Sequence, residues 1–138
     1  METIGKIKSL RYLSLDGHSG NSTAHITPAG VAHLSHLTHL DIKYTEDRKG
    51  CGVVMSPTLM AALAELPLTH LRLRCYSSKA TPALFGALAR CQTLKRLHIE
   101  DATGIEVLRE ALPDCHITTS LHDWEQLNGI LPLGRWAE

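Results

Sequence analysis

The four residues LTHL occur twice in this chain, at positions 37–40 and 68–71, and both copies continue with alternating apolar and polar residues. They belong to a longer pattern, LxxLxL, in which Ile or Cys can replace Leu. Its copies are LRYLSL (10–15), LTHLDI (37–42), LTHLRL (68–73), LKRLHI (94–99) and LPDCHI (112–117). Such alternation is typical of a short strand with one buried face. The repeat therefore predicts five short strands built on the same plan.

A second pattern follows each of the first four copies and predicts a short helix. Its segments are TPAGVAHL (27–34), SPTLMAAL (56–63), TPALFGAL (81–88) and DATGIEVL (101–108). Each opens with a residue that caps helices well, and three continue with Pro, which the first helical position tolerates. The predicted caps are Thr27, Ser56, Thr81 and Asp101. Two apolar positions in each segment share one helix face. They are Val31, Met60, Phe85 and Ile105, and Leu34, Leu63, Leu88 and Leu108.

Stacking of these units explains how they form a core, because one strand and one helix cannot bury their apolar faces alone. With these motifs, and with ITPAGVAHLSHLTHLDI above all, the sequence resembles the leucine-rich repeat family, in particular bacterial and F-box-like repeats with a "TDAG"-type helix cap. The resemblance implies an α/β solenoid, a right-handed β-α superhelix with a parallel sheet on its concave face and short helices on its convex face. Residues 1–118 would form four strand–helix units and a fifth strand, and residues 119–138 a C-terminal capping segment.

Composition narrows the classes of function. The chain has 138 residues, enough for one domain, and its 14 basic and 14 acidic residues balance. A neutral chain of this kind does not favour a nucleic-acid or membrane partner. We find no apolar run of membrane-spanning length and no signal peptide, so we expect a cytoplasmic protein. The cysteines lack metal-ligand spacing and are expected to be reduced thiols, with a Cys51–Cys75 disulfide as the alternative.

Regions outside the repeat leave alternatives open. The long segments after the first two strands are either tolerated insertions or a rim that contacts a partner. In the tail, Trp124 and Trp136 either cover the end of the core or serve as docking aromatics. Ile4 and Ile7 leave little room for an N-terminal cap, so the chain could be a piece of a longer repeat array, or a second copy could pair there.

Polar positions of the predicted strands form three columns on one face of the sheet. They are Tyr12, His39, His70, Arg96 and Asp114; Ser14, Asp41, Arg72, His98 and His116; and Asp16, Lys43, Arg74, Glu100 and Thr118. In leucine-rich repeat proteins this face commonly binds a partner, so the resemblance implies a non-catalytic protein-interaction module. The residues expected to bind are Tyr12, His39, Asp41, His70, Arg72, Arg74, Arg96, His98 and Glu100. Their Arg-rich centre suits an acidic or phosphorylated partner, because guanidinium groups bind carboxylates and phosphates bidentately.

Two other functions remain open at this stage. The chain could be the substrate-recognition segment of a bacterial effector or of a ubiquitin-ligase adaptor. Alternatively, His98 and His116, with Asp114 and Glu100 nearby, could hold zinc or iron. No catalytic or nucleotide-binding motif occurs in the sequence, so we expect neither an enzyme nor a cofactor.

Overall fold

The computed structural model describes residues 6–17, 28–44, 57–75, 82–99 and 104–120, and these form strands alternating with helices. The strands are β1 (Tyr12–Gly17), β2 (His39–Tyr44), β3 (His70–Cys75), β4 (Arg96–Ile99) and β5 (His116–Thr118). The helices are α2 (Pro28–Ala32), α3 (Pro57–Ala64), α4 (Pro82–Leu88) and α5 (Glu106–Ala111). The strand–helix alternation expected from the repeat is therefore present.

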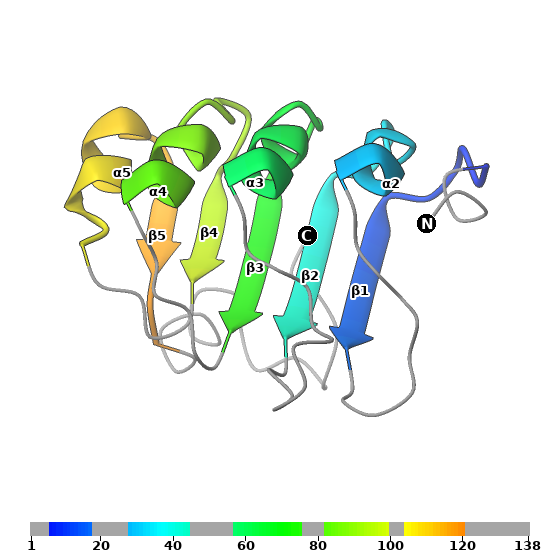
Figure 1. Cartoon of the computed structure of the whole chain (residues 1–138), viewed down its shortest axis with the longest axis horizontal. Coiled ribbons are helices and arrows are strands. Elements are labelled where there is room, and N and C mark those ends of the chain that lie inside the picture. Colours follow the sequence, from blue (N-terminus) through cyan, green and yellow to red (C-terminus); the bar gives the residue numbers. More distant parts are fainter. Residues whose placement is uncertain (1–5, 18–27, 45–56, 76–81, 100–103, 121–138) are drawn as a thin grey trace.

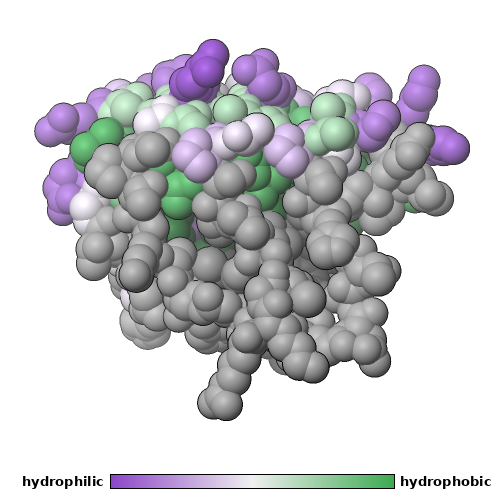
Figure 2. All heavy atoms as spheres, in the orientation of Figure 1, coloured by the Kyte–Doolittle hydropathy of each residue, from purple (hydrophilic) through white to green (hydrophobic). Residues whose placement is uncertain are grey.

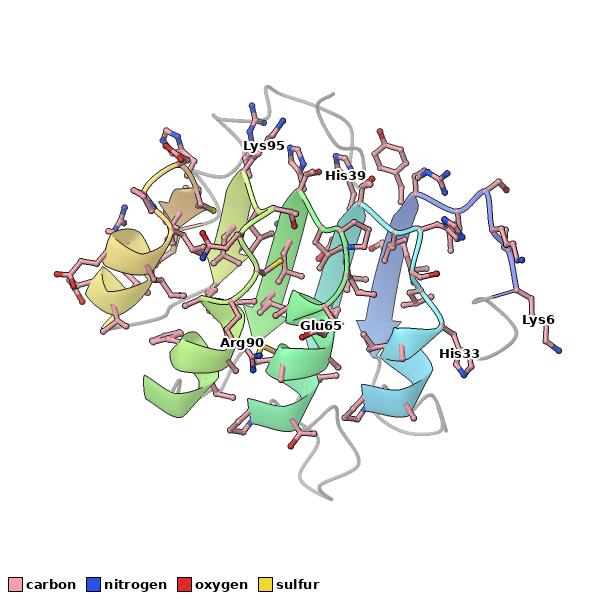
Figure 3. The ribbon with its side chains drawn as sticks, turned by 90° about the horizontal axis from the view of Figure 1, so that it is seen from above. Lys6, His33, His39, Glu65, Arg90 and Lys95 are labelled. Carbon is pink, nitrogen blue, oxygen red and sulfur yellow. The ribbon has the colours of Figure 1, made fainter. Side chains whose placement is uncertain are left out.

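One parallel sheet contains all five strands, in the order β1-β2-β3-β4-β5. The four helices lie side by side on one face of this sheet, each packed against the next (Figure 1). Figure 3 shows the same strands and helices from above. The predicted α/β architecture with a parallel sheet and short helices is confirmed at this level.

The core lies between the sheet and the helix layer. From β2 to β5, one apolar level of the sheet aligns Leu40, Leu71, Leu97 and Ile117, and all four are buried. Both predicted sets of helix-side residues are buried against it. Burying one such aliphatic side chain stabilises the fold by roughly 1.5–3 kcal/mol. The alternation in the strands and the spacing in the helices thus serve the same core.

Helix starts follow the prolines. Helices α2, α3 and α4 begin at Pro28, Pro57 and Pro82, as predicted, while the expected caps Thr27, Ser56 and Thr81 lie outside the described residues. The prediction that Asp101 caps the fourth helix is wrong, because α5 begins at Glu106 and Ile105 occupies its N-cap position. Gly104 has a φ of 72°, which a right-handed helix cannot include, so the helix starts after it.

The register of β5 differs from the one that the repeat predicts. The first four strands pair as expected, with Tyr12, His39, His70 and Arg96 aligned. Arg96 then pairs with His116 rather than with Asp114. The residue before each of β1 to β4 has a carbonyl that accepts hydrogen bonds from the start of the next strand, and for β4 the Lys95 carbonyl accepts from the His116 amide at 2.8 Å. The fifth strand is therefore shifted by two residues.

The N-terminal end of the core is less covered than its middle. Leu10 and Leu13 are only partly buried, whereas Leu37 and Leu40, their counterparts in the next unit, are fully buried. The tail with Trp124 and Trp136, and residue Ile4, lie outside the described residues, as do Cys51 and the side chain of Cys75. Within the part of the chain that is described, no helix has the length and apolar character needed to cross a membrane.

Candidate interaction surface

The polar face of the sheet, opposite the helices, carries two rows of described side chains. We define the first row as Tyr12, His39, His70, Arg96 and His116, and the second row as Ser14, Asp41, Arg72, His98 and Thr118. The backbones of Asp16, Lys43 and Arg74 are aligned as the third predicted column. The side chains of these three residues, and the whole of Glu100, lie outside the described part of the structure.

Stacked rings form one half of the first row. The His39 and His70 rings are nearly parallel, with centroids 4.1 Å apart and an interplanar angle of 11°. Tyr12 extends the stack at a centroid distance of 4.3 Å from His39. Among the described residues, Tyr12 is one of three large hydrophobic residues that are exposed to solvent, and its exposed fraction is 46%. The stack follows directly from the parallel register, which places these three residues on neighbouring strands.

Each of the two stacked histidines is held by the threonine that precedes it. Thr38 Oγ1 lies 2.8 Å from His39 Nδ1, and Thr69 Oγ1 lies 2.9 Å from His70 Nδ1. Each threonine hydroxyl also has a backbone acceptor on the preceding unit, the Arg11 carbonyl for Thr38 and the Thr38 carbonyl for Thr69, both at 3.3 Å. The repeated Thr-His dipeptide thus builds the same ring anchor twice.

Both anchored histidines are neutral near pH 7. Burial lowers the pKa of His39 below its ordinary value of 6.5. The pKa of His70 falls to about 4, because its ring is partly buried and because His39, Arg96 and Lys95 oppose a positive charge there. Stacked neutral rings of this kind avoid the repulsion that two imidazolium ions would feel at the same distance.

The other half of the first row is basic. Arg96 is partly exposed, and Lys95, Arg11 and His116 are exposed. Figure 3 shows Lys95 and His39 at the same edge of the sheet, where the strands begin. In Figure 2 strongly hydrophilic residues gather along the upper part of the molecule, the side from which the strands run in Figure 1. The first row and the residues that precede its strands therefore present cations beside an aromatic stack.

The second row consists of polar contacts around three buried residues, Asp41, His98 and Thr118. Ser14 Oγ donates to Asp41 Oδ2 at 3.4 Å, and Arg72 Nη1 lies 3.9 Å from the same carboxylate oxygen. Farther along, His98 Nδ1 lies 3.0 Å from Thr118 Oγ1. Buried polar groups need such partners, because losing one leaves a group without the hydrogen bonds that water would supply. The second row therefore links neighbouring strands through their side chains.

The buried side chains of the second row differ from the expectation that this whole face of the sheet is open to solvent. Asp41 is 4% exposed and His98 is 0% exposed, although all the described helices lie on the opposite side of the sheet. Alternation along a strand states which face a side chain occupies, but it carries no information about what covers that face. Of the residues predicted to bind a partner, Tyr12 is exposed, and His70, Arg72 and Arg96 are partly exposed. The other three with described side chains, His39, Asp41 and His98, are buried.

The corrected register also separates the histidines that were expected to pair. His98 lies opposite Thr118, while His116 lies opposite Arg96 and Asp114 precedes the strand. The predicted pairing of His98 with His116 is therefore wrong. Among the described residues, no group of three or more His, Cys, Asp or Glu side chains is close enough to hold a metal ion.

Cys91 is a buried free thiol and Cys115 is a partly buried one. Burial raises the pKa of Cys91, and it raises the pKa of Cys115 to about 12, with Cys91 contributing. Thiols with such values remain protonated at neutral pH and are poor nucleophiles. Sequence reasoning missed the ring anchors Thr38 and Thr69, although the signal was present, since the second letter of LTHL is the anchoring residue.

No family model matches the chain, and no curated protein or solved structure is significantly similar to it.

Proposed function

We propose that this chain is a non-catalytic protein-interaction module of the leucine-rich repeat type, a solenoid that binds a segment of a partner protein along the first row. The observation that carries the proposal is the alignment of exposed Tyr12, partly exposed His70 and Arg96, and exposed His116 along one parallel sheet, with the buried ring of His39 between Tyr12 and His70. Neighbouring strands are about 4.8 Å apart, so the row extends for about 19 Å, the length of roughly six extended residues.

The residue types of the first row support this role. Tyr and Arg are enriched among the residues that dominate binding energies, because they combine a large contact area with directed hydrogen bonds. Tyr12 offers its ring at one end of the row, and Arg96 offers a guanidinium group toward the other end. Such a surface suits a partner segment with acidic or phosphorylated side chains.

We assign to the second row the role of keeping the first row rigid. The Asp41 contacts join β1, β2 and β3, and the contact of His98 with Thr118 joins β4 and β5. These bonds keep the strands in register, so the first-row side chains are arranged before a partner arrives. Preorganisation of this kind improves affinity, since less conformational freedom is lost on binding.

A capture experiment with a matched control tests the proposal. Arg96→Glu reverses a charge in the first row, and Arg109→Glu reverses an exposed charge on α5, on the helix side. A chain carrying a photo-crosslinking residue at position 12 is compared in three forms, with no further change, with Arg96→Glu and with Arg109→Glu. We expect crosslinked partners to be lost with Arg96→Glu and kept with Arg109→Glu. Equal capture by all three forms would remove the first row as the binding surface.

A further inference from the structure

His70 lies at the point where the aromatic and the basic halves of the first row meet. His39 of β2 stacks on one side of its ring, and Arg96 of β4 is its register partner on the other side. The other titratable or charged groups around this point are Tyr12 and Arg11 at β1, Asp41 of β2, Arg72 of β3, Lys95 before β4 and His116 of β5. Among the described residues of the first row and of the positions just before its strands, none is a carboxylate.

The Thr–His anchors are compatible with both charge states of the rings. When Nδ1 carries a hydrogen, as it does in an imidazolium ion, it donates to the threonine Oγ1. The threonine hydroxyl then has its own acceptor, because Thr69 Oγ1 lies 3.3 Å from the Thr38 carbonyl and Thr38 Oγ1 lies 3.3 Å from the Arg11 carbonyl. Protonation of either ring therefore requires no loss of its threonine contact.

Protonation of His70 is opposed first by its partial burial and then by the surrounding positive charge, and an anionic ligand acts against the second of these. Carboxylates placed beside Arg96 and Lys95 offset the repulsion that these cations exert on a charged His70 ring. A ligand that prefers the protonated form of a site must, by linkage, draw protons onto that site. We propose that the first row binds an acidic peptide segment together with a proton taken up by the His39–His70 stack, so that binding strengthens as the medium becomes more acidic.

This inference rests on the proposed interaction function and commits to carboxylates as the anionic groups. Glu and Asp side chains have ordinary pKa values near 4 and stay mostly ionised at pH 5.5. A phosphate ester has a second pKa near 6 and loses charge over the same range. Acidification therefore strengthens the attraction for an acidic segment, because the protein gains charge while the ligand keeps its own.

The size of the effect follows from the pKa of His70. That pKa is about 4 in the free protein. Carboxylates offset the charge contribution and not the burial, so the ordinary value of about 6.5 is the upper limit of the pKa in the complex. At that limit the Kd for the peptide falls about eightfold between pH 7.0 and pH 5.5. About one proton is then taken up for each peptide bound at pH 5.5.

Calorimetry with a hexaglutamate peptide tests the inference. Titrations at pH 7.0 and 5.5, in buffers with different ionisation enthalpies, give both the affinity and the number of protons taken up. We expect tighter binding at pH 5.5, by up to about eightfold, and uptake of up to about one proton. His70→Gln should abolish both, whereas His33→Gln, which removes an exposed histidine on the helix side (Figure 3), should change neither. An NMR titration of the unmodified protein provides a check that needs no variant, since the peptide should raise the pKa of His70.

The other outcomes separate the two proposals. Binding of hexaglutamate with equal affinity at both pH values and no proton uptake would overturn the proton linkage and leave the interaction function standing. Absence of hexaglutamate binding at both pH values would overturn the acidic-segment inference, and the capture experiment would then decide the interaction function alone. A phosphoserine peptide that binds where hexaglutamate does not would overturn the choice of carboxylates.

Discussion

The two rows lie on the same strands and on the same face of the sheet, two residues apart, yet they differ in almost every property. The first row is partly open to solvent and combines stacked rings with cations. In the second row Asp41, His98 and Thr118 are buried, Arg72 is partly exposed and Ser14 is exposed, and the contacts of the row connect strand to strand. Equivalent positions of a repeat therefore do not share a role merely because they share a face. Exposure and contacts divide them into a row that can meet a partner and a row that maintains the sheet.

Removing charge from each row should produce the largest contrast. We expect Asp41→Ala to lower the free energy of unfolding by about 3 kcal/mol, because it leaves Arg72 in a mostly buried position without its carboxylate. Arg96→Ala, at the partly exposed first row, should cost about 1 kcal/mol or less. Urea unfolding at pH 7 measures both, with Asp41→Asn as the control that keeps the shape of the side chain. Equal losses for Asp41→Ala and Arg96→Ala would contradict the division into rows.

Acidification should weaken the fold through the first row. The pKa values of His39 and His70 are lowered in the folded state, so the unfolded chain binds more protons between about pH 6.5 and pH 4. The stabilising effect of the neutral rings is therefore complete above pH 6.5 and is lost as the pH falls toward 4. Urea midpoints measured across this range should show a smaller decline for His70→Gln than for the unmodified chain. An unchanged decline would mean that the stack does not titrate as described.

Removing one hydroxyl from each row should give a smaller contrast. Thr118→Val deletes the oxygen next to fully buried His98, and we expect a loss of about 1–2 kcal/mol. Thr69→Val deletes the oxygen next to partly exposed His70, where water can replace it, and we expect about 0.5 kcal/mol. Thermal unfolding of the two variants provides the measurement. A larger loss for Thr69→Val would reverse the assignment of the rows.

Much of this fold could be predicted from the sequence, because its signals are local. The alternation of residues in each strand placed the apolar side chains correctly, and the prolines at 28, 57 and 82 marked the helix starts. The pairing of β1 to β4 followed from aligning the copies of the repeat. Short-range patterns determine such features, since each depends on a few neighbouring residues.

Two features could not be predicted, for different physical reasons. A shift of two residues keeps every side chain of a strand on the same face, so alternation alone could not exclude the observed register of β5. The connections before the two strands also differ in length, because residues 112–115 join α5 to β5 whereas residues 89–95 join α4 to β4. The burial of Asp41 and His98 could not be predicted either. Alternation along a strand gives the face on which a side chain lies, but not how exposed that side chain is.

Hydrogen–deuterium exchange at the Cε1 position of individual histidines, followed by mass spectrometry, tests the division into two rows most directly. It reports solvent access and pKa for each ring, without any substitution. Our account predicts fast exchange at His116, intermediate exchange at His70 and very slow exchange at His98. With hexaglutamate bound, exchange at His70 and His116 should slow while exchange at His98 stays the same. Fast exchange at His98, or protection of His98 in place of His70, would contradict the account.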